Sequence, residues 1–412
     1  MKKKILFVDD EPNLLQGLQR MLRPMREEWE MSFVQSGAEA LELLGQQNFD
    51  VVVSDMRMPG MDGAQLLAEV QRRFPQIIRI ILSGHSDKEF VLRSVKAVHQ
   101  YLSKPCEPET LKAVISRACS LDQWLAQDSL KKIVSQITVL PSLPSLYLEI
   151  VEALNSPDIS LHKIGDIISK DIGMTAKILQ LVNSAFFGLP RRISNPNQAV
   201  TLLGLDLVKT LVLSLKIFQQ FDQKNISASI LNNLWQHSFR TGVMAKKIAQ
   251  LESQGQKLID DAFTSGLLHD LGKPILLMNF PERYKQIEEL KKQRQISTWV
   301  GEKEIIGAEH SIIGAYLLRL WGLPDSVVEA VAFHHSFAVD CPGFTPLLAT
   351  QAANIITHLL NNPQEYSPDI SNMDYWGKLG LTDKFRNWIE ICKKMDNPEE
   401  EGEENGTNFI CR

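Results

Sequence analysis

Five short apolar runs alternate with amphipathic segments over the first 120 residues, and this alternation is what most constrains the fold. The apolar runs are Lys4–Val8, Met31–Val34, Phe49–Ser54, Ile77–Ser83 and Gln100–Leu102. Helix-like stretches such as Asn13–Leu22 and Ala38–Leu44 lie between them. Strands that alternate with helices form a parallel sheet covered on both faces. We therefore expect an α/β domain whose site lies at the carboxyl ends of its strands.

Acidic side chains follow two of these runs. Asp9 and Asp10 end the first run, and Asp55 ends the third just before the turn sequence Met56–Gly60. Carboxylates at neighbouring strand ends repel one another unless a cation neutralises them. Mg²⁺ is a hard cation that prefers such oxygen ligands. The sequence therefore predicts a Mg²⁺ site in which one carboxylate can attack a phosphoryl group and carry it.

Three further residues complete this predicted site. Ser83 ends the fourth run and offers a hydroxyl to an incoming phosphoryl oxygen. Lys104, followed by Pro105, ends the last run and supplies a cation for the same oxygens. Tyr101 lies three residues before Lys104, where its ring could change rotamer with the state of Ser83.

Together with the segment Met58–Gly63, these residues resemble the receiver domain of bacterial two-component response regulators. The resemblance covers about residues 1–120 and implies a flavodoxin-like fold. It also implies that Mg²⁺ is held by Asp10, Asp55 and a main-chain carbonyl near Arg57, with Asp9 in the same acidic site. Asp55 would be the phosphoacceptor, and a sensor histidine kinase would be the phosphodonor.

The composition favours a cytoplasmic protein of two or three domains. The chain has 412 residues, of which 44% are hydrophobic and 23% charged. No apolar stretch approaches the ~20 residues that a membrane helix needs, and the five cysteines show no paired spacing. The net charge of −5 equals that of segment 396–412, which holds six acids and one arginine. We therefore expect no binding to DNA or to a membrane.

The pattern changes after the receiver-like segment. Residues 110–134 read as one helical stretch, with two helices broken near Asp128–Ser129 as the alternative, and Pro141–Pro144 marks a boundary. The predicted organisation has five parts: a receiver domain at 1–120, a helical linker at 121–140, an all-α domain at 141–340, a helical extension at 341–395 and an acidic disordered tail at 396–412.

Helical spacing of apolar residues dominates the second half. The predicted blocks are Ile164–Leu181, Ala199–Phe218, Leu234–Leu251, Ala262–Leu276, Ile312–Leu320 and Val327–His335. Polar residues interrupt several apolar helix faces: His237, His269, Asp270, His310, His334 and His335. Polar groups on such faces need partners. Either these side chains bond to one another and hold the helices in register, or several converge on a metal ion.

Over about residues 135–340 the chain resembles the HDOD domain, an HD-related output domain of bacterial signalling proteins. The resemblance rests on Leu140–Pro144, Lys170–Leu179, Asn183–Ala185, Ala199–Gly204, Gly266–Lys273 and the histidines from His310 to His335. It implies a helical module similar to HD-type metal-dependent phosphohydrolases but generally regulatory. The histidines at 237 and 269, with Asp270 and Lys273, match the H…HD…K core of the hydrolases.

One departure from the hydrolase pattern decides the expected function. The final metal-binding Asp is replaced by Asn354, a weak neutral ligand. We therefore expect the HDOD-like half to act by binding a downstream protein or a nucleotide ligand, under the control of Asp55, and not as an enzyme. The alternative is a phospho-regulated phosphohydrolase or cyclic-dinucleotide phosphodiesterase with Mn or Fe at the histidines. A homodimer is left open.

Overall fold

The computed structural model describes most of both halves of the chain. The described residues are 2–83, 97–104, 106, 109–116, 133, 140–141, 149–150, 152–154, 160–183, 192–205, 208, 218–219, 228–253, 255–337, 343–361 and 370–396. The predicted linker at 121–140 lies almost wholly outside them, and so does the predicted acidic tail after Asp396.

The amino-terminal half is a five-stranded parallel sheet with the strand order β2-β1-β3-β4-β5. The strands are β1 (Lys3–Val8), β2 (Trp29–Val34), β3 (Val51–Asp55), β4 (Ile78–Ser83) and β5 (Gln100–Ser103). Each lies within three residues of a predicted apolar run, so the predicted α/β fold is confirmed. Strands β3 and β4 are buried along their whole length and mostly apolar, as parallel strands between helices are.

Helices cover this sheet, and their starts follow from capping residues. The elements are α1 (Pro12–Met21), the short 3-10 helix η1 (Arg23–Glu27), α2 (Gly37–Gln46) and α3 (Gly63–Arg73). The Ser36 side chain accepts from the Glu39 backbone N–H at the start of α2. Asp62 and Gln65 form a capping box at the start of α3. Residues 109–116 are also helical.

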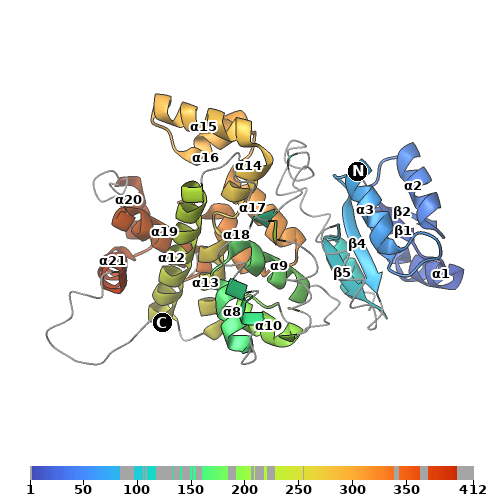
Figure 1. Cartoon of the computed structure of the whole chain (residues 1–412), viewed down its shortest axis with the longest axis horizontal. Coiled ribbons are helices and arrows are strands. Elements are labelled where there is room, and N and C mark those ends of the chain that lie inside the picture. The colour runs from blue at the N-terminus through green and yellow to red at the C-terminus, as the bar shows by residue number, and fades with distance from the viewer. Residues whose placement is uncertain are drawn as a thin grey trace.

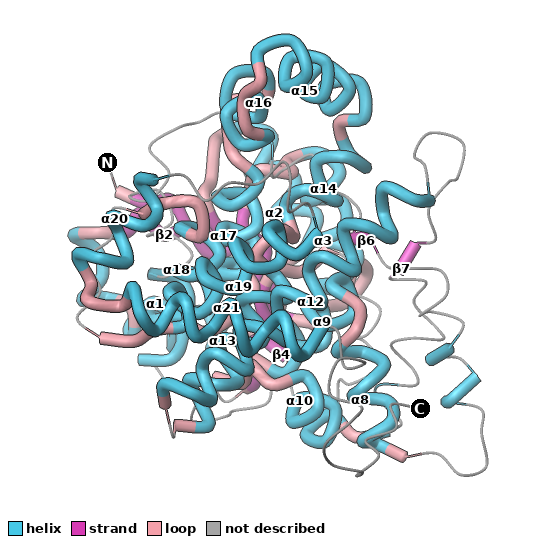
Figure 2. Tube along the Cα trace, turned by 90° about the vertical axis from the view of Figure 1, so that its left-hand side faces the viewer, coloured by secondary structure: helices cyan, strands magenta, loops and turns pink. Residues whose placement is uncertain are grey.

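The second half is helical, with one small sheet (Figure 1). Its helices are α8 (Leu161–Ser169), α9 (Ile172–Val182), α10 (Pro196–Leu203), α12 (Ala228–Glu252), α13 (Gln256–Leu268), α14 (Gly272–Asn279), α15 (Pro281–Arg294), α16 (Thr298–Ile305), α17 (His310–Leu320), α18 (Asp325–Phe333), α19 (Pro346–Asn361), α20 (Ile370–Lys378) and α21 (Thr382–Asp396). The strands β6 (Leu140–Pro141) and β7 (Phe218–Gln219) pair in parallel. Helices α15 and α16 project from the body in both Figure 1 and Figure 2.

Three helical predictions need correction. The predicted block Ile164–Leu181 is two helices, because Asp171 takes an extended conformation and caps the second one at the Met174 N–H. The block Ala262–Leu276 is also two helices, with the break at 269–271. The block Ala199–Phe218 is helical at its start but is not one helix: α10 ends at Leu203, just before Gly204, where φ is +76°, and Phe218 lies in β7.

Two hydrophobic clusters hold the described structure together. The first runs from the sheet of the amino-terminal half into α8, α9, α14, α17 and α18. The second joins α12, α13 and α19 to the carboxy-terminal helices through the buried rings of Trp376, Phe385 and Trp388. Since the first cluster is continuous across both halves, they share apolar packing. Among the described residues, no helix combines the length and hydropathy that crossing a membrane requires.

Candidate functional site

Three carboxylates gather at the carboxyl ends of β1 and β3. One oxygen each of Asp9, Asp10 and Asp55 lies within 4.8 Å of the others. Asp9 and Asp55 are buried, whereas Asp10 is partly exposed. The Arg57 N–H donates to Asp55 Oδ2 at 3.1 Å, and the Glu11 N–H donates to Asp9 Oδ1 at 3.0 Å. The three predicted carboxylates therefore lie together and present oxygen atoms of the kind that Mg²⁺ binds.

Lys104, the residue after β5, places its ammonium group between two of these carboxylates. Its Nζ donates to Asp9 Oδ2 at 2.8 Å and forms an ion pair with Asp55. Burial raises the pKa of Asp55 above its ordinary value, although the hydrogen bond and charge of Lys104 oppose that rise. Burial would lower the pKa of Lys104, but the two carboxylates raise it overall. The ammonium form of Lys104 is therefore favoured here.

Ser83 and Tyr101 occupy the strands beyond Asp55. The Ser83 hydroxyl is buried one residue beyond Leu82, the residue that pairs with Asp55, and it has no hydrogen-bond partner among the described residues. Tyr101 is 1% exposed, so its ring lies in the core; its change of rotamer stays a prediction. A buried hydroxyl without a partner is costly. A phosphoryl oxygen on Asp55 would give Ser83 that partner.

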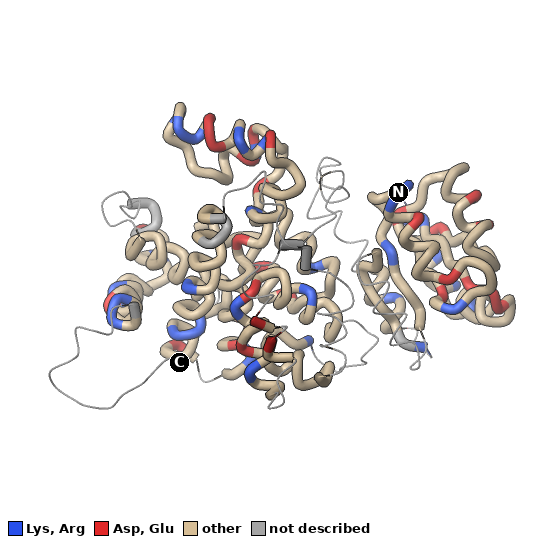
Figure 3. The backbone as a smooth tube through the Cα atoms, viewed as in Figure 1, with Lys and Arg blue, Asp and Glu red and all other residues tan. Residues whose placement is uncertain are grey.

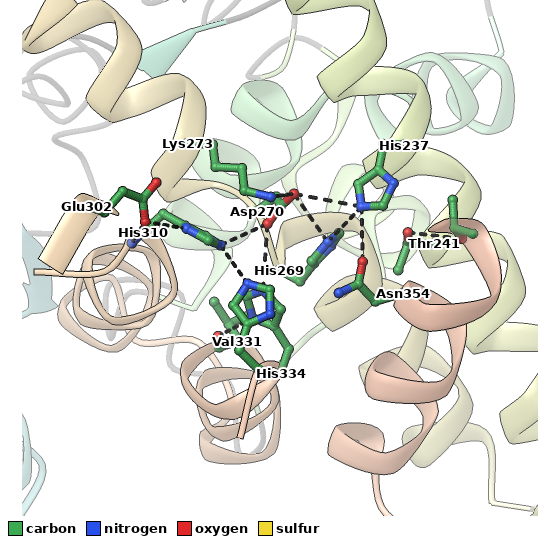
Figure 4. Close-up of polar contacts among 12 residues, drawn as sticks. His237, Thr241, His269, Asp270, Lys273, Glu302, His310, Val331, His334 and Asn354 are labelled. Atoms are coloured by element: carbon green, nitrogen blue, oxygen red, sulfur yellow. Dashed lines mark hydrogen bonds and ion pairs between the residues drawn. The ribbon is translucent and has the colours of Figure 1, made fainter. Parts of the chain in front are cut away.

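In the helical half, one oxygen of Asp270 faces two of the predicted histidines (Figure 4). Asp270 Oδ2 lies 2.7 Å from Lys273 Nζ, 3.4 Å from His269 Nε2 and 3.8 Å from His237 Nε2. His237 Nε2 also lies 3.2 Å from His269 Nε2 and 3.1 Å from Asn354 Oδ1. Burial would raise the pKa of Asp270, but His269 and Lys273 lower it well below its ordinary value.

The other oxygen of Asp270 faces a second group of imidazoles. Its Oδ1 lies 3.1 Å from His310 Nε2 and 3.6 Å from His334 Nε2. His335 Nε2 lies 3.2 Å from His310 Nε2. The six residues predicted from the sequence therefore come together, with Asp270 shared between two potential metal-binding groups. We call these six residues the Asp270 cluster.

Backbone carbonyls orient two of these imidazoles. His269 Nδ1 donates to Gly266 O at 2.7 Å, and His334 Nδ1 donates to Val331 O at 2.8 Å. Burial lowers the pKa of both histidines, so both rings are neutral near pH 7. A neutral ring that donates through Nδ1 carries its lone pair on Nε2. Both Nε2 atoms therefore point their lone pairs at Asp270, the orientation that metal-binding histidines need.

A buried carboxylate orients the third imidazole. The Nδ1 atom and the backbone N–H of His310 both donate to Glu302 Oε2, at 2.6 Å and 2.8 Å. Burial alone would lower the pKa of His310, but the charge of Glu302 and the bond to Asp270 raise it. Glu302, on α16, was not among the residues predicted from the sequence. Glu302 lies eight residues before His310 among other charged residues, so the sequence pattern did not mark it as part of the site.

His358 also belongs to this site and was not predicted. Its ring centroid lies 4.6 Å from that of His237, and burial, helped by the charge of Lys273, lowers its pKa to about 4. It follows Asn354 by four residues on α19. That spacing puts both side chains on one helix face, and it was the signal in the sequence that could have identified His358.

A helix break and a close backbone contact position Asp270. His269 and Asp270 lie between α13 and α14, so both side chains leave the chain where the helix changes direction. A Cβ on Gly272 would lie 2.1 Å from the main-chain O of His310. Only glycine allows α14 to approach the start of α17 so closely. A Cβ on Gly63 would similarly lie 2.0 Å from Asp55 O in the other half.

Comparison with protein families agrees with both halves of this description. The model for the response regulator receiver domain matches residues 5–116, and the model for the HDOD domain matches residues 140–337. The chain is a response regulator that joins a receiver domain to an HDOD domain.

Individual relatives match parts of the chain. An uncharacterised protein of Treponema pallidum (strain Nichols) is 32% identical over 57% of this chain and 45% of its own length. The hydrogenase transcriptional regulatory protein HoxA of Cupriavidus necator is 38% identical over 28% of this chain and 23% of its own length. The chain thus spans less than half of either relative. The crystal structure of the MmoQ response regulator from Methylococcus capsulatus str. Bath has a similar fold, with a TM-score of 0.50, 22% identity, and coverage of 62% of this chain and 94% of its own.

The receiver and HDOD domains meet along β5, the edge strand that faces the helical half in Figure 1. Gln100 Nε2 donates to Leu320 O at 2.7 Å. Gln180 Nε2 lies 3.2 Å from His99 O and 3.3 Å from Val98 O. Each buried amide therefore bonds to the backbone of the other domain, which fixes the position of β5 against α9 and α17.

Close packing and charge reinforce this junction. A Cβ on Gly322, where φ is +82°, would lie 2.9 Å from Gln100 Nε2, so glycine keeps room for the amide. Arg79 is buried on β4 and donates to main-chain carbonyls. Burial lowers the pKa of Arg79 to about 10, and Tyr316 of α17 opposes that shift. Helix α17 therefore begins at His310, in the Asp270 cluster, and contacts the receiver domain near its carboxyl-terminal end.

Proposed function

We propose that this response regulator accepts a phosphoryl group on Asp55 and transmits the change to its HDOD domain through β5. One observation carries the proposal: residues at the two ends of this short strand contact the acidic site on one side and the HDOD domain on the other. Lys104 follows β5 and pairs with Asp55, while Gln100 begins β5 and donates to Leu320 O of the HDOD domain. A sensor histidine kinase is the expected phosphodonor, as for receiver domains in general.

The residues around Asp55 fit a phosphoryl transfer. When bound, Mg²⁺ would offset the charge of the carboxylates and of the phosphoryl group. One oxygen of Asp55 would attack the phosphorus of the donor, and the bond from phosphorus to the donor's histidine (or acetate, for acetyl phosphate) would break, while the Arg57 N–H donates to the other oxygen of Asp55. The product adds charge and acceptor oxygens beside Ser83 and Lys104. Lys104 would then divide its three donors between Asp9 and the phosphoryl oxygens, and Ser83 would gain its missing partner.

This redistribution would move the carboxyl end of β5 relative to β4. Because β5 has four residues, a shift at Lys104 reaches Gln100 within one short strand. The bond from Gln100 to Leu320 O would then pass the shift to α17, which begins at His310 in the Asp270 cluster. Swinging a two-state equilibrium from mostly off to mostly on requires about 5.5 kcal/mol. Two or three new charge-assisted hydrogen bonds, at ~1.5–3 kcal/mol each, supply that amount.

The test is uptake of a phosphoryl group by the full chain. Purified protein incubated with acetyl phosphate and Mg²⁺ should gain the mass of one phosphoryl group, and Asp55→Ala should gain none. Asp383→Ala is the matched control, because Asp383 is almost fully exposed on α21 and far along the chain from the acidic site. Uptake in Asp55→Ala equal to that of the control would refute the assignment.

A second function, metal-dependent hydrolysis of a phosphate ester by the HDOD domain, is favoured by one observation. His237 Nε2 faces His269 Nε2, Asn354 Oδ1 and the carboxylate of Asp270. One proton on His237 can satisfy only one of these acceptors. A divalent cation among them would satisfy all, so this donor set fits Mn²⁺ or Fe²⁺. When bound, the metal would lower the pKa of a water molecule and polarise the ester.

Elemental analysis and turnover test this second function. After loading with Mn²⁺ or Fe²⁺ and removal of excess ion, the protein should retain metal that Asp270→Asn does not retain. Retained metal with hydrolysis of bis(4-nitrophenyl) phosphate, absent in Asp270→Asn, would support an enzyme. Retained metal without turnover would leave the HDOD domain as a binding module, and metal content equal in both proteins would rule the metal site out.

A further inference from the structure

A cavity of about 740 Å³ lies beside the Asp270 cluster. Its walls come from α12, α14, α15 and α19, with Thr298 from the start of α16. His237 and Asp270 form part of its floor. The side chains of Leu234, Leu277 and Tyr284 give it an apolar wall. This volume is in the range that small-molecule ligands occupy, and a mixed apolar and polar lining is typical of such sites.

Charged side chains line the polar side of this cavity, and the ammonium groups of Lys273, Lys285, Lys291 and Lys292 outnumber the carboxylates of Asp270, Glu288 and Glu289. Lys273 lies on the floor, where its Nζ pairs with Asp270 and is largely buried. Lys291 and Lys292 approach from α15, the helix with alternating basic and acidic residues at the top of Figure 3. Lys291 pairs only loosely with Glu288, at 3.6 Å, and Lys292 has no ion pair within the described residues. These lysines therefore keep N–H donors for a ligand.

His358 adds another polar group to the lining of this cavity. It lines the cavity from α19 and lies outside the His-Asp sequence at 269–270. The charges of Lys273 and Lys291 both act on its ring. Because Lys273 belongs to α14 and Lys291 to α15, cations from two helices line the same cavity as His358. An anion there would be stabilised by both ammonium groups and could accept a hydrogen bond from the ring.

We propose that Lys273, Lys291 and His358 form a subsite for the phosphate group of a nucleotide-sized ligand. The wall formed by Leu234, Leu277 and Tyr284 would hold the uncharged body of that ligand. A dianionic phosphate has the charge to match two ammonium groups and enough oxygens to accept from all three side chains. The inference rests on the proposed output role of the HDOD domain and deepens it, because it names the chemical class of the ligand.

Calorimetric titration of the EDTA-treated full chain tests this subsite without any bound metal. The probes are inorganic phosphate, which tests the anion subsite alone, and adenosine 5′-monophosphate, which also tests the apolar wall. Both should bind, with the nucleotide at least about tenfold tighter because its body buries apolar surface. Lys291→Gln and His358→Gln should each weaken both probes about tenfold. Lys303→Gln is the matched control, since Lys303 is exposed on α16 and does not line the cavity.

Three outcomes would overturn the proposal. They are no saturable binding of either probe, nucleotide binding no tighter than phosphate binding, or an affinity of Lys291→Gln for the probes equal to that of the Lys303→Gln control. Circular dichroism identifies a His358→Gln protein that has not folded. In that case Lys291→Gln, a change of a half-exposed residue on α15, decides the test. Phosphoryl uptake by Asp55 is measured on the same preparations. Loss of probe binding with normal uptake defeats this inference alone, whereas normal binding without uptake defeats only the receiver function.

Discussion

The two charged clusters of this response regulator balance their buried charge in opposite ways. In the receiver domain, three carboxylates lie together and the ammonium group of Lys104 pairs with two of them, Asp9 and Asp55. In the HDOD domain, the carboxylate of Asp270 lies among five imidazoles and Lys273, and the carboxylate of Glu302 pairs with one of those imidazoles, His310. The first cluster therefore has an excess of anionic oxygen and suits Mg²⁺. The second is rich in neutral nitrogen and suits Mn²⁺ or Fe²⁺.

The acidic site at Asp55 is suited to gaining charge, whereas the Asp270 cluster depends on the charge that Asp270 already carries. At Asp55, burial already raises the pKa of the carboxyl, and Ser83 and Lys104, the proposed partners of a phosphoryl group, lie nearby. At Asp270, Lys273 and the nearby imidazoles face one carboxylate, Glu302 serves His310 as a second one, and Asn354 offers only a neutral oxygen to His237. Changes to the two aspartates should consequently have unequal effects on stability.

The largest expected difference is between Asp270→Asn and Asp55→Asn. Asp270→Asn removes the partner of the buried Lys273 and of His310, so the free energy of unfolding should fall by about 3–5 kcal/mol. Asp55→Asn leaves Lys104 paired with Asp9, so the loss there should stay below about 1 kcal/mol. Urea unfolding of EDTA-treated protein measures both. Equal losses would show that the two clusters do not differ in this way.

Acid should destabilise the metal-free HDOD domain through His237. Burial lowers the pKa of His237 to about 3 in the folded protein, against ~6.5 when unfolded. The unfolded chain therefore binds this proton more readily, so stability is complete above pH 6.5 and is lost as the pH falls. At pH 5 the pKa difference of His237 alone should lower the free energy of unfolding by roughly 2 kcal/mol relative to its value at high pH.

Urea unfolding at pH 7 and pH 5 checks the sign of this effect. His237→Gln should reduce the difference between the free energies of unfolding at the two pH values. His310 acts in the opposite direction, because its raised pKa stabilises the fold at low pH and that contribution is lost as the pH rises. A wild-type protein more stable at pH 5 than at pH 7 would contradict the burial of neutral imidazoles in this cluster.

A smaller effect is expected from restoring an anionic ligand. Asn354→Asp places a carboxylate beside His237 Nε2, which Asn354 Oδ1 now faces at 3.1 Å. The affinity of the HDOD domain for Mn²⁺ should rise about tenfold or more. Titration of the Asp55→Ala background avoids competition from the receiver site. Affinity unchanged by Asn354→Asp would show that position 354 is not a ligand position.

Much of the receiver site follows from the sequence because strand ends define it. Asp9, Asp55 and Lys104 each follow an apolar run, and parallel strands bring their carboxyl ends to one edge. The helical half is less predictable, because helix breaks at Asp171 and at 269–271 occur without a preceding glycine or proline. Apolar periodicity alone runs through such breaks.

Long-range contacts account for the residues that were missed. Glu302 and His358 reach the Asp270 cluster from α16 and α19; no local motif marks Glu302, and only the four-residue spacing from Asn354 marks His358. Helix α15 has only Tyr284 and Ile287 buried, so its sequence lacks an apolar face. The two-residue strands β6 and β7 are too short for alternation to be detected. Tertiary packing determines all of these features.

Hydrogen exchange along α17 tests the central claim, that β5 couples Asp55 to the HDOD domain, most directly. Phosphorylation with acetyl phosphate should change amide protection in His310–Leu320 of the wild type, by a factor in the ~5–150-fold range of typical coupling. Gln100→Leu, which removes the bond to Leu320 O, should accept phosphate normally yet lose most of that change. A change in α17 that is the same in Gln100→Leu, or one confined to residues before 117 in the wild type, would contradict the account.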